Sequence, residues 1–208
     1  YWFHKKNDKI IIAAVDCTGH GVPGAFLSLV ASNLLHNIIV NKGIFDPSRI
    51  LNLLHFSVFS YLKQNETHNQ DGMDIALCCI DKKERTVSFA GAKNPLVYVK
   101  KDELKIFKGI KSSIGGFSTY PDKQLNFKNH VVQLDDEPTT FYLYTDGFQD
   151  QFGGKKGEKF RTVPFRSLLR EISQEPVREQ KGLLKKAFED WKGKGKQIDD
   201  ILVLGFKI

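Results

Sequence analysis

The chain has 208 residues, of which 41% are hydrophobic and 12% aromatic, and its formal net charge is +7. This size suits one globular domain with a sizeable core, or two small ones. No apolar run approaches the roughly 18 residues of a membrane span, so the pattern excludes an integral membrane segment. The lysines are scattered in short pairs without interleaved aromatic residues, so we expect no nucleic-acid partner and no membrane contact by this domain.

The three cysteines, Cys17, Cys78 and Cys79, are odd in number and lack the spacing of a zinc site. Such sparse cysteine usage indicates a reducing compartment, and we therefore expect a cytoplasmic domain. The chain begins at Tyr1 rather than Met and enters a strand-like segment within about ten residues. We interpret it as the C-terminal part of a longer protein.

Apolar periodicity predicts the first elements: a buried strand over residues 9–15, a helix over 22–41 and a second helix that begins at Asp46. An antiparallel meander and further strands follow, at residues 74–81, 86–91, 95–100, 103–108, 125–134 and 140–145. Two helices, at 163–173 and 176–191, precede a last strand at 201–208. Pairs of helices on either side of a block of strands favour an α+β fold with antiparallel sheets.

Acidic residues recur at the ends of these predicted strands. Asp16 and Asp146 follow a strand, whereas Asp74 and the pair Asp199 and Asp200 precede one. Because neighbouring antiparallel strands run in opposite directions, these carboxylates would gather at one rim if the strands are neighbours. Clustered carboxylates repel one another unless a cation neutralises them, and oxygen ligands without Cys or His suit Mg²⁺ or Mn²⁺. Two such ions can activate a water molecule for attack on phosphorus.

Each feature also has a simpler structural interpretation. A single Asp after a strand is usually a turn residue or a helix cap, and His20 could pack or cap instead of acting in catalysis. Gly19, Gly21 and Gly24 form no dinucleotide or P-loop pattern, although a glycine-rich turn beside Asp16 would let a phosphate come close. The recurrence of the acids at strand ends is what favours a metal site.

Several stretches resemble motifs of one family, and they occur in that family's order from Tyr1 to Ile208. They are "VDCTGHGVPGAFLSLV", "DGMDIALCCID", "FAGAKNPLVYV", "LYTDGFQDQFGG" and "QIDDILVLGFKI". The family is the SpoIIE-like branch of the PPM-type, metal-dependent protein serine/threonine phosphatases. The resemblance implies that residues 1–208 form a single domain, a four-layer α-β-β-α sandwich with two antiparallel sheets. It also implies two Mn²⁺ or Mg²⁺ ions at one end of the central sheets.

The resemblance assigns roles to individual residues. Asp16 would bridge both metals and act in catalysis, with His20 as the second catalytic candidate. The backbone carbonyl of Cys17 would complete the shell of one metal, and Asp146 and Asp199 would bind the second.

Four further residues are implied as supporting residues or as ligands of a third metal. Gly147 would permit the turn that aims Asp146, and Asp200 would support the neighbouring ligand. Asp71 or Asp74 lies near the place where some relatives hold a weak third metal.

Two departures from the family pattern are apparent. The family's first strand carries a further aspartate ligand, whereas this sequence starts at "YWF". We therefore expect that acid and the first strand to be missing from this chain. Some wider relatives also grip the substrate phosphate with an arginine near the start of the domain, and no arginine here matches it.

The resemblance implies a phosphatase that removes phosphate from phosphoserine or phosphothreonine on a regulatory protein of the anti-sigma-antagonist type. An upstream sensor domain would lie in the same chain, and the phosphatase domain would be the cytoplasmic output domain of a bacterial signalling protein. The sensor could be membrane-bound, and the phosphatase domain could form a homodimer. Residues 22–65 are candidates for a regulatory surface. The alternatives are a catalytically degenerate, phosphatase-like binding module and an enzyme that hydrolyses a small phosphoester.

Overall fold

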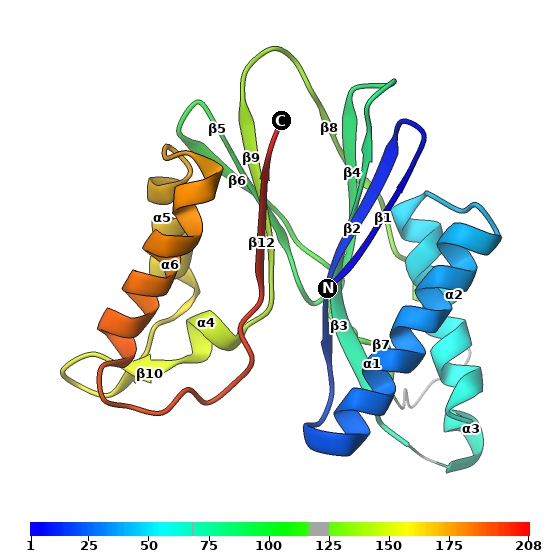
Figure 1. Cartoon of the computed structure of the whole chain (residues 1–208). Coiled ribbons are helices and arrows are strands. Elements are labelled where there is room, and N and C mark those ends of the chain that lie inside the picture. Colours follow the sequence, from blue (N-terminus) through cyan, green and yellow to red (C-terminus); the bar gives the residue numbers. More distant parts are fainter. Residues whose placement is uncertain (68, 117–124) are drawn as a thin grey trace. The chain divides into compact units, whose positions relative to one another are not determined.

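The computed structural model describes residues 1–67, 69–116 and 125–208 (Figure 1). The chain divides into two compact units, which we describe separately. Unit 1 comprises Tyr1–Pro95 and Phe107–Leu134, and unit 2 comprises Leu96–Ile106 and Asp135–Ile208.

Unit 1 contains an antiparallel sheet with the strand order β1-β2-β3-β4-β8, and a short strand β7 pairs with β3. The strands are β1 (Trp2–Lys6), β2 (Lys9–Cys17), β3 (Gly72–Asp81), β4 (Thr86–Ala92), β7 (Ile114–Gly115) and β8 (His130–Gln133). β2 and β3 are the central strands, and their ladder runs without a break from the Lys9–Asp81 pair to the Cys17–Met73 pair.

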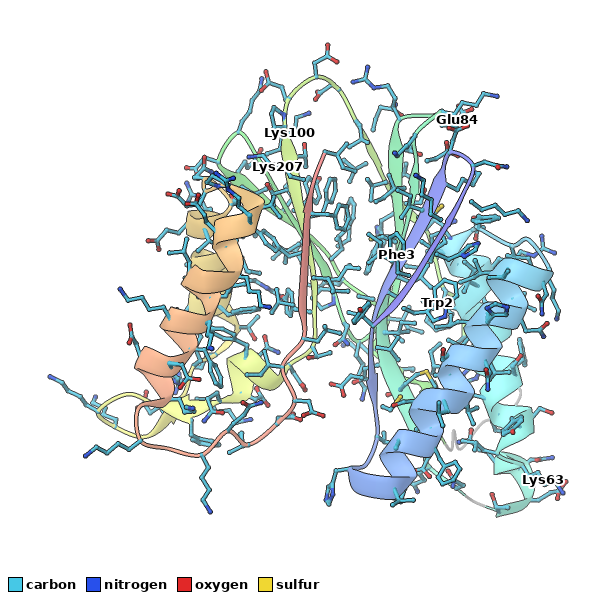
Figure 2. All side chains as sticks on the ribbon, in the orientation of Figure 1. Trp2, Phe3, Lys63, Glu84, Lys100 and Lys207 are labelled. Atoms are coloured by element: carbon cyan, nitrogen blue, oxygen red, sulfur yellow. The ribbon has the colours of Figure 1, made fainter. Side chains whose placement is uncertain are left out.

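Strand β1 is a short strand before residue 9 that the apolar periodicity did not predict. Trp2–Lys6 pairs with β2, with Trp2 opposite Ala13 and Lys6 opposite Lys9. Its side chains alternate, since Trp2 packs against the unit 1 core whereas Phe3 is 56% exposed (Figure 2). Only five residues long and strongly basic, this segment gives a weak periodic signal.

The helices of unit 1 cover one face of its sheet. They are α1 (Gly21–His36), the π-helical turn η1 (Asn37–Asn41), α2 (Pro47–Tyr61) and the short α3 (Gln64–Thr67). Helix α2 begins where the sequence predicts, because the Asp46 side chain accepts a hydrogen bond from the Arg49 amide at 2.8 Å and Pro47 occupies the first turn. Leucine and isoleucine side chains of α1 and α2 pack against β2, β3 and β4 in one core.

The continuous helix Gly21–Asn41 has 21 residues and a mean hydropathy of 1.4, enough by length and composition to cross a membrane. The sequence analysis expected no such segment, because it sought an uninterrupted apolar run and this helix contains polar residues. Leu27, Ala31, Leu35 and Ile39 of this helix are at most 5% exposed within the unit 1 core. The core helix of a globular domain has these properties as well.

Unit 2 contains a second antiparallel sheet with the order β12-β9-β5-β6. Its strands are β5 (Leu96–Lys100), β6 (Glu103–Phe107), β9 (Thr139–Tyr144) and β12 (Val203–Lys207), and β10 (Phe152–Gly153) pairs separately with β11 (Glu158–Lys159). The helices α4 (Gly147–Asp150), α5 (Thr162–Ile172) and α6 (Val177–Lys192) complete the unit. Phe148, Phe165 and Phe188 of these helices pack on Tyr142 and Tyr144 of the sheet.

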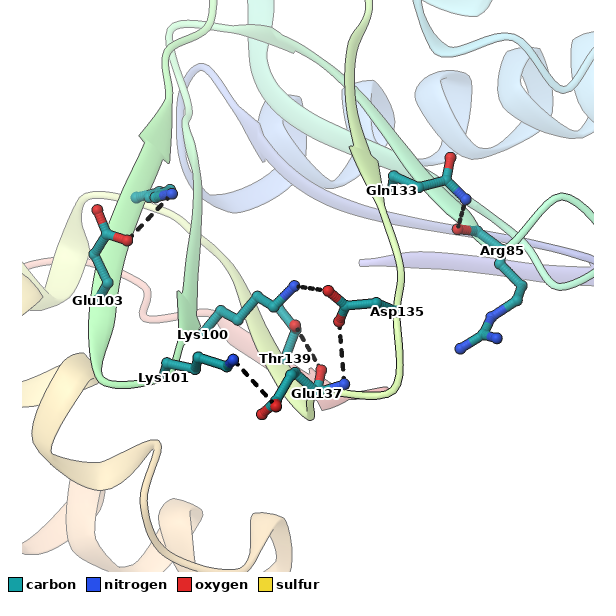
Figure 3. Close-up of polar contacts among 9 residues, drawn as sticks. Arg85, Lys100, Lys101, Glu103, Gln133, Asp135, Glu137 and Thr139 are labelled. Atoms are coloured by element: carbon teal, nitrogen blue, oxygen red, sulfur yellow. Dashed lines mark hydrogen bonds and ion pairs between the residues drawn. The ribbon is translucent and has the colours of Figure 1, made fainter.

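Exposed ion pairs connect the end of β5 with the turn before β9 (Figure 3). Lys100 pairs with Asp135, and Lys101 Nζ lies 3.1 Å from Glu137. The Glu137 amide also donates to Asp135 Oδ1 at 3.1 Å, which fixes the turn that leads into β9. Exposed pairs of this kind contribute little free energy individually.

The α+β class and the two antiparallel sheets are therefore confirmed, and each sheet has helices on one face. The predicted meander is wrong in one respect: β3 and β4 belong to the sheet of unit 1, whereas β5 and β6 belong to that of unit 2. Hydrophobic alternation identifies a strand but does not identify its partner, and Asn94-Pro95 between β4 and β5 breaks the pairing.

Candidate active site

Strands β2 and β3 end in two aspartates that lie directly opposite each other. Asp16 pairs with Asp74 in the antiparallel register. Side chains of directly opposed residues share a face of the sheet. Their neighbours Val15 and Ile75 pack into the core beneath α1 and α2, so by strand alternation the two carboxylates lie on the face turned away from these helices.

Both carboxylate oxygens of Asp74 are engaged within unit 1. Ser113 Oγ donates to Asp74 Oδ1 at 2.6 Å, and Lys93 Nζ lies 3.3 Å from Asp74 Oδ2. The sequence analysis did not single out Lys93 or Ser113. The sequence signal for Lys93 is its position as a charged residue inside the mostly apolar stretch "FAGAKNPLVYV".

Asp71 lies just beyond this pair of acids, where β2 and β3 continue into loops. Thr18 Oγ1 donates to Asp71 Oδ1 at 3.3 Å, and Asn69 Nδ2 donates to Asp71 Oδ2 at 3.0 Å. The Thr18 and Gly72 backbones are joined by a 2.9 Å hydrogen bond. The structure therefore brings Asp71 to the same end of unit 1 as Asp16 and Asp74.

The glycine-rich turn after β2 has a specific backbone geometry. Gly19 and Gly21 have φ values of +81° and +66°, a region that favours glycine. A Cβ on Gly24 would lie 2.7 Å from the Gly19 carbonyl oxygen, so the turn folds back onto the first turn of α1. His20 lies between the first two glycines at the N-cap of α1, where its exposed side chain makes no capping hydrogen bond.

Cys17 is half-buried beside Asp16. Burial raises the pKa of its thiol above the ordinary value, although a hydrogen bond with Ser28 opposes this shift. The role of the Cys17 backbone carbonyl as a metal ligand stays a prediction.

In unit 2, Asp146 follows β9 and lies against the segment that leads into β12. The Thr145 amide donates to the Leu202 carbonyl at 3.1 Å, and the Leu202 amide donates to Thr145 Oγ1 at 3.2 Å. A Cβ on Gly147 would lie 2.1 Å from the Asp200 carbonyl oxygen, so only glycine fits there. Gly147 thus lets the chain after the exposed Asp146 approach the Asp200 backbone closely.

Asp146 occupies the N-cap position of α4, yet its side chain makes no capping hydrogen bond. In this it differs from Asp46, which caps α2. Asp199 Oδ1 accepts from the Asp200 amide at 2.7 Å, which places both residues in a tight exposed turn. The Asp146 side chain therefore does not cap α4, whereas Asp199 fits the interpretation as a turn residue.

A buried glutamine, which the sequence analysis missed, organises this loop. Gln151 is 1% exposed, and its Nε2 donates to the carbonyls of Phe152 and Lys196, each at 2.9 Å. Its Oε1 accepts from the Ile198 amide at 3.3 Å, and its carbonyl accepts from Trp191 Nε1 at 3.0 Å. Gln151 thus fixes the path of residues 196–198, directly before Asp199.

The predicted acids are therefore collected in two groups, Asp16 with Asp71 and Asp74 in unit 1, and Asp146 with Asp199 and Asp200 in unit 2. The expectation of one rim of one sheet is wrong, because β2 and β3 belong to one sheet and β9 and β12 to another. In the part of the chain that the structure describes, no three His, Cys, Asp or Glu side chains form a ready metal-binding group. Each group nonetheless offers exposed or half-exposed oxygen donors, which fit a hard divalent cation.

Two antiparallel sheets, each with helices on one face and acids near the strand ends, are consistent with a PP2C-type phosphatase domain. The family model described as stage II sporulation protein E (SpoIIE) matches residues 6–208. The chain therefore belongs to the SpoIIE family, and the resemblance to SpoIIE-like PPM phosphatases is confirmed. These are phosphatase domains of bacterial signalling proteins.

Solved structures agree with this family. The SiaA-PP2C domain of Pseudomonas aeruginosa is 33% identical, with a TM-score of 0.88 over 100% of this chain and 79% of that chain. The phosphatase domain of SpoIIE from Bacillus subtilis, with a fragment of its regulatory domain, is 16% identical, with a TM-score of 0.70 over 98% of this chain and 57% of that chain. RsbX in complex with magnesium is 14% identical, with a TM-score of 0.62 over 98% of this chain and 84% of that chain. The last two show likeness of fold alone. A comparison with curated proteins finds no match.

Proposed function

We propose that this domain is a metal-dependent phosphoprotein phosphatase that hydrolyses phosphoserine or phosphothreonine on a regulatory protein in bacterial signalling. The observation that carries the proposal is the place of the acids. In each unit a pair of antiparallel strands ends in aspartates whose positions match the family motifs, Asp16 and Asp74 in one and Asp146 and Asp199 in the other. Directly opposed carboxylates such as Asp16 and Asp74 repel each other unless a cation, either a metal ion or an ammonium group, lies near them.

In this proposal, as the family resemblance implies, Asp16 and the Cys17 carbonyl would hold Mn²⁺ or Mg²⁺ in unit 1, and Asp146 and Asp199 would hold Mn²⁺ or Mg²⁺ in unit 2. When bound, such ions lower the pKa of a water molecule and neutralise charge on the phosphoryl oxygens. Magnesium in the RsbX structure supports the use of a divalent ion. The backbone of the glycine-rich turn, which has no side chains at Gly19 and Gly21, leaves room for the phosphoryl group, and the exposed His20 lies in the same turn.

The regulatory protein substrate and a regulatory role for α1 belong to the same proposal. Helix α1 begins at Gly21, five residues after Asp16, and its Val22, Phe26 and Leu29 side chains are 62–69% exposed. Exposed apolar groups of this size are typical of a protein-binding surface. A partner that shifts α1 would therefore act close to Asp16.

The test measures release of phosphate from phosphoserine peptides and from para-nitrophenyl phosphate by the full-length protein, with and without Mn²⁺. We expect Mn²⁺-dependent turnover that both Asp16→Asn and Asp146→Asn abolish. Asp8→Asn, in the exposed turn between β1 and β2, is the matched control and should keep full activity.

Full activity in either Asp16→Asn or Asp146→Asn would refute the metal assignment. A folded wild-type protein that binds Mn²⁺ but shows no turnover would instead identify a catalytically degenerate binding module.

A further inference from the structure

Lys93 occupies an unusual backbone position next to the acids of unit 1. Ala92 is opposite Ile75 in the β3–β4 ladder, so Lys93 follows at the level of Asp74. Its Nζ lies 3.3 Å from Asp74 Oδ2, and its φ is +57°, which is uncommon for a residue other than glycine.

The turn around Lys93 is fixed by its backbone. The Lys93 amide donates to the Ile110 carbonyl at 2.8 Å, and the Ile110 amide donates to the Gly91 carbonyl at 2.9 Å. A Cβ on Gly91 would lie 2.4 Å from the Asn94 carbonyl oxygen, so the turn is closely packed. The lysine is therefore presented from a rigid support despite its strained φ.

The ammonium group has capacity for a further ligand. A lysine ammonium has three N–H donors, and the contact with Asp74 uses one of them. The Lys93 side chain is 51% exposed, and Ser113 already satisfies the other oxygen of Asp74. The neighbouring Asn94 is 8% exposed, and its Nδ2 has no hydrogen-bond partner among the residues that the structure describes. Buried donors without a partner are rare, so Asn94 is a second available donor in the turn that carries Lys93.

This end of unit 1 needs a cation if a phosphate is to approach it. Asp16, Asp71 and Asp74 are all acidic, and a phosphate monoester carries nearly two negative charges at neutral pH. The sequence offers no arginine at the position where some wider relatives bind the phosphate.

We propose that Lys93 binds the phosphoryl group of the substrate and the phosphate product, and that Asp74 positions Lys93 instead of ligating a metal. The identity of the substrate rests on the proposed function, but binding of inorganic phosphate does not. The ammonium group holds the phosphoryl oxygens by charge-assisted hydrogen bonds, and the Asp74 carboxylate restricts its rotamers.

The experiment compares wild-type protein with Lys93→Met, Lys93→Arg and Asp74→Asn. Lys82→Met, an exposed lysine in the turn at the other end of β3 and β4, is the matched control. Three quantities are measured: the inhibition constant of inorganic phosphate, the KM for a phosphoserine peptide, and the rise in Tm that inorganic phosphate produces without substrate.

We expect Lys93→Met to raise both constants about tenfold, the cost of losing one charge-assisted contact, with kcat changed by less than about threefold. Lys93→Arg should restore most of the binding, Asp74→Asn should have a smaller effect than Lys93→Met, and Lys82→Met should have none. The Tm rise with phosphate should disappear only in Lys93→Met.

Unchanged phosphate constants in folded Lys93→Met would overturn the proposal, as would a loss of kcat and Mn²⁺ affinity with KM unchanged. If Lys93→Met does not fold, Lys93→Gln replaces it and the same criteria apply. A wild-type protein that shows no turnover but binds phosphate through Lys93 would overturn the proposed function and retain this inference.

Discussion

The two ends of the β2–β3 ladder have opposite electrostatics. At one end Lys9 faces Asp81, with Nζ 2.7 Å from Oδ2, so the opposed residues attract each other. At the other end, within the same two strands, Asp16 faces Asp74. At that end it is Lys93, outside the ladder, whose Nζ lies 3.3 Å from the Asp74 carboxylate. The contrast fits the proposed role of the acidic end in binding and catalysis, whereas the Lys9 end stabilises the fold.

Unit 2 repeats this contrast in its β9–β12 ladder. At one end Thr139 and Ile208 exchange two backbone hydrogen bonds, of 2.7 and 3.0 Å. At the other end Asp146 lies beside the Asp199–Asp200 segment, which depends on Gly147 and Gln151 for its path. The acids of unit 1 are thus placed by strand register and those of unit 2 by a loop.

The largest expected effect separates activity from stability at the acidic end of β2. Asp16→Asn should lower phosphatase activity by about 100-fold or more, because it removes an essential charge at the reacting centre. In metal-free buffer the free energy of unfolding should change by less than about 1 kcal/mol, because an amide of the same shape keeps part of the hydrogen bonding of the carboxylate and no longer repels Asp74. Kinetics and urea denaturation measure the two quantities. A variant that loses stability in parallel with activity would remove the contrast between the two ends.

The second prediction concerns the loop that places the acids of unit 2. Gly147→Ala puts a methyl group 2.1 Å from the Asp200 carbonyl oxygen, so the loop or α4 must shift. We expect a loss of about 1–3 kcal/mol in the free energy of unfolding together with weaker Mn²⁺ binding.

Gly182→Ala is the matched control, because Gly182 lies within α6 and a Cβ there meets no atom within 4 Å. It should leave Mn²⁺ binding unchanged and stabilise the protein by up to about 1 kcal/mol. Equal effects of the two substitutions in chemical denaturation would show that the close approach at Gly147 is unimportant.

The sequence predicts much of this molecule because local patterns determine its strands and helices. The apolar run 10–15, the Asp46-Pro47 helix start and the amphipathic α5 and α6 each identify their element without a partner. The family motifs further assign Asp16, Asp146 and Asp199 as site residues, and these assignments stay predictions until metal binding is measured.

What the sequence does not reveal depends on contacts between distant segments. Strands β4 and β5 are consecutive and similarly apolar, so nothing local shows that they join different sheets. In the sequence alone, nothing distinguishes Gln151 and Lys93 from ordinary exposed polar residues. Their roles follow only from burial against residues 196–198 in the first case and from proximity to Asp74 in the second.

The smallest expected effect concerns the attractive end of the β2–β3 ladder. The hydrogen bond from Lys9 lowers the pKa of the Asp81 carboxyl below its ordinary value, and the Glu84 amide adds to this shift. A carboxyl with a lowered folded-state pKa stabilises the protein above its unfolded-state pKa of about 4, and this contribution is lost as the pH falls through the folded-state value. Lys9, whose pKa is raised, loses its contribution only in strongly alkaline solution.

Asp81→Asn should therefore lower the free energy of unfolding at pH 7 by up to about 1 kcal/mol and leave phosphatase activity unchanged. Its stability should also fall less steeply than that of the wild type below about pH 4, because one lowered pKa is gone.

Glu137→Gln, in the exposed pair with Lys101, is the control and should change stability by less than about 0.5 kcal/mol (Figure 3). Urea denaturation at a series of pH values measures both effects. Identical acid profiles for Asp81→Asn and the wild type would mean that the Lys9–Asp81 ion pair does not stabilise the ladder. The two ends of the β2–β3 ladder would then not differ in their electrostatic contribution to stability.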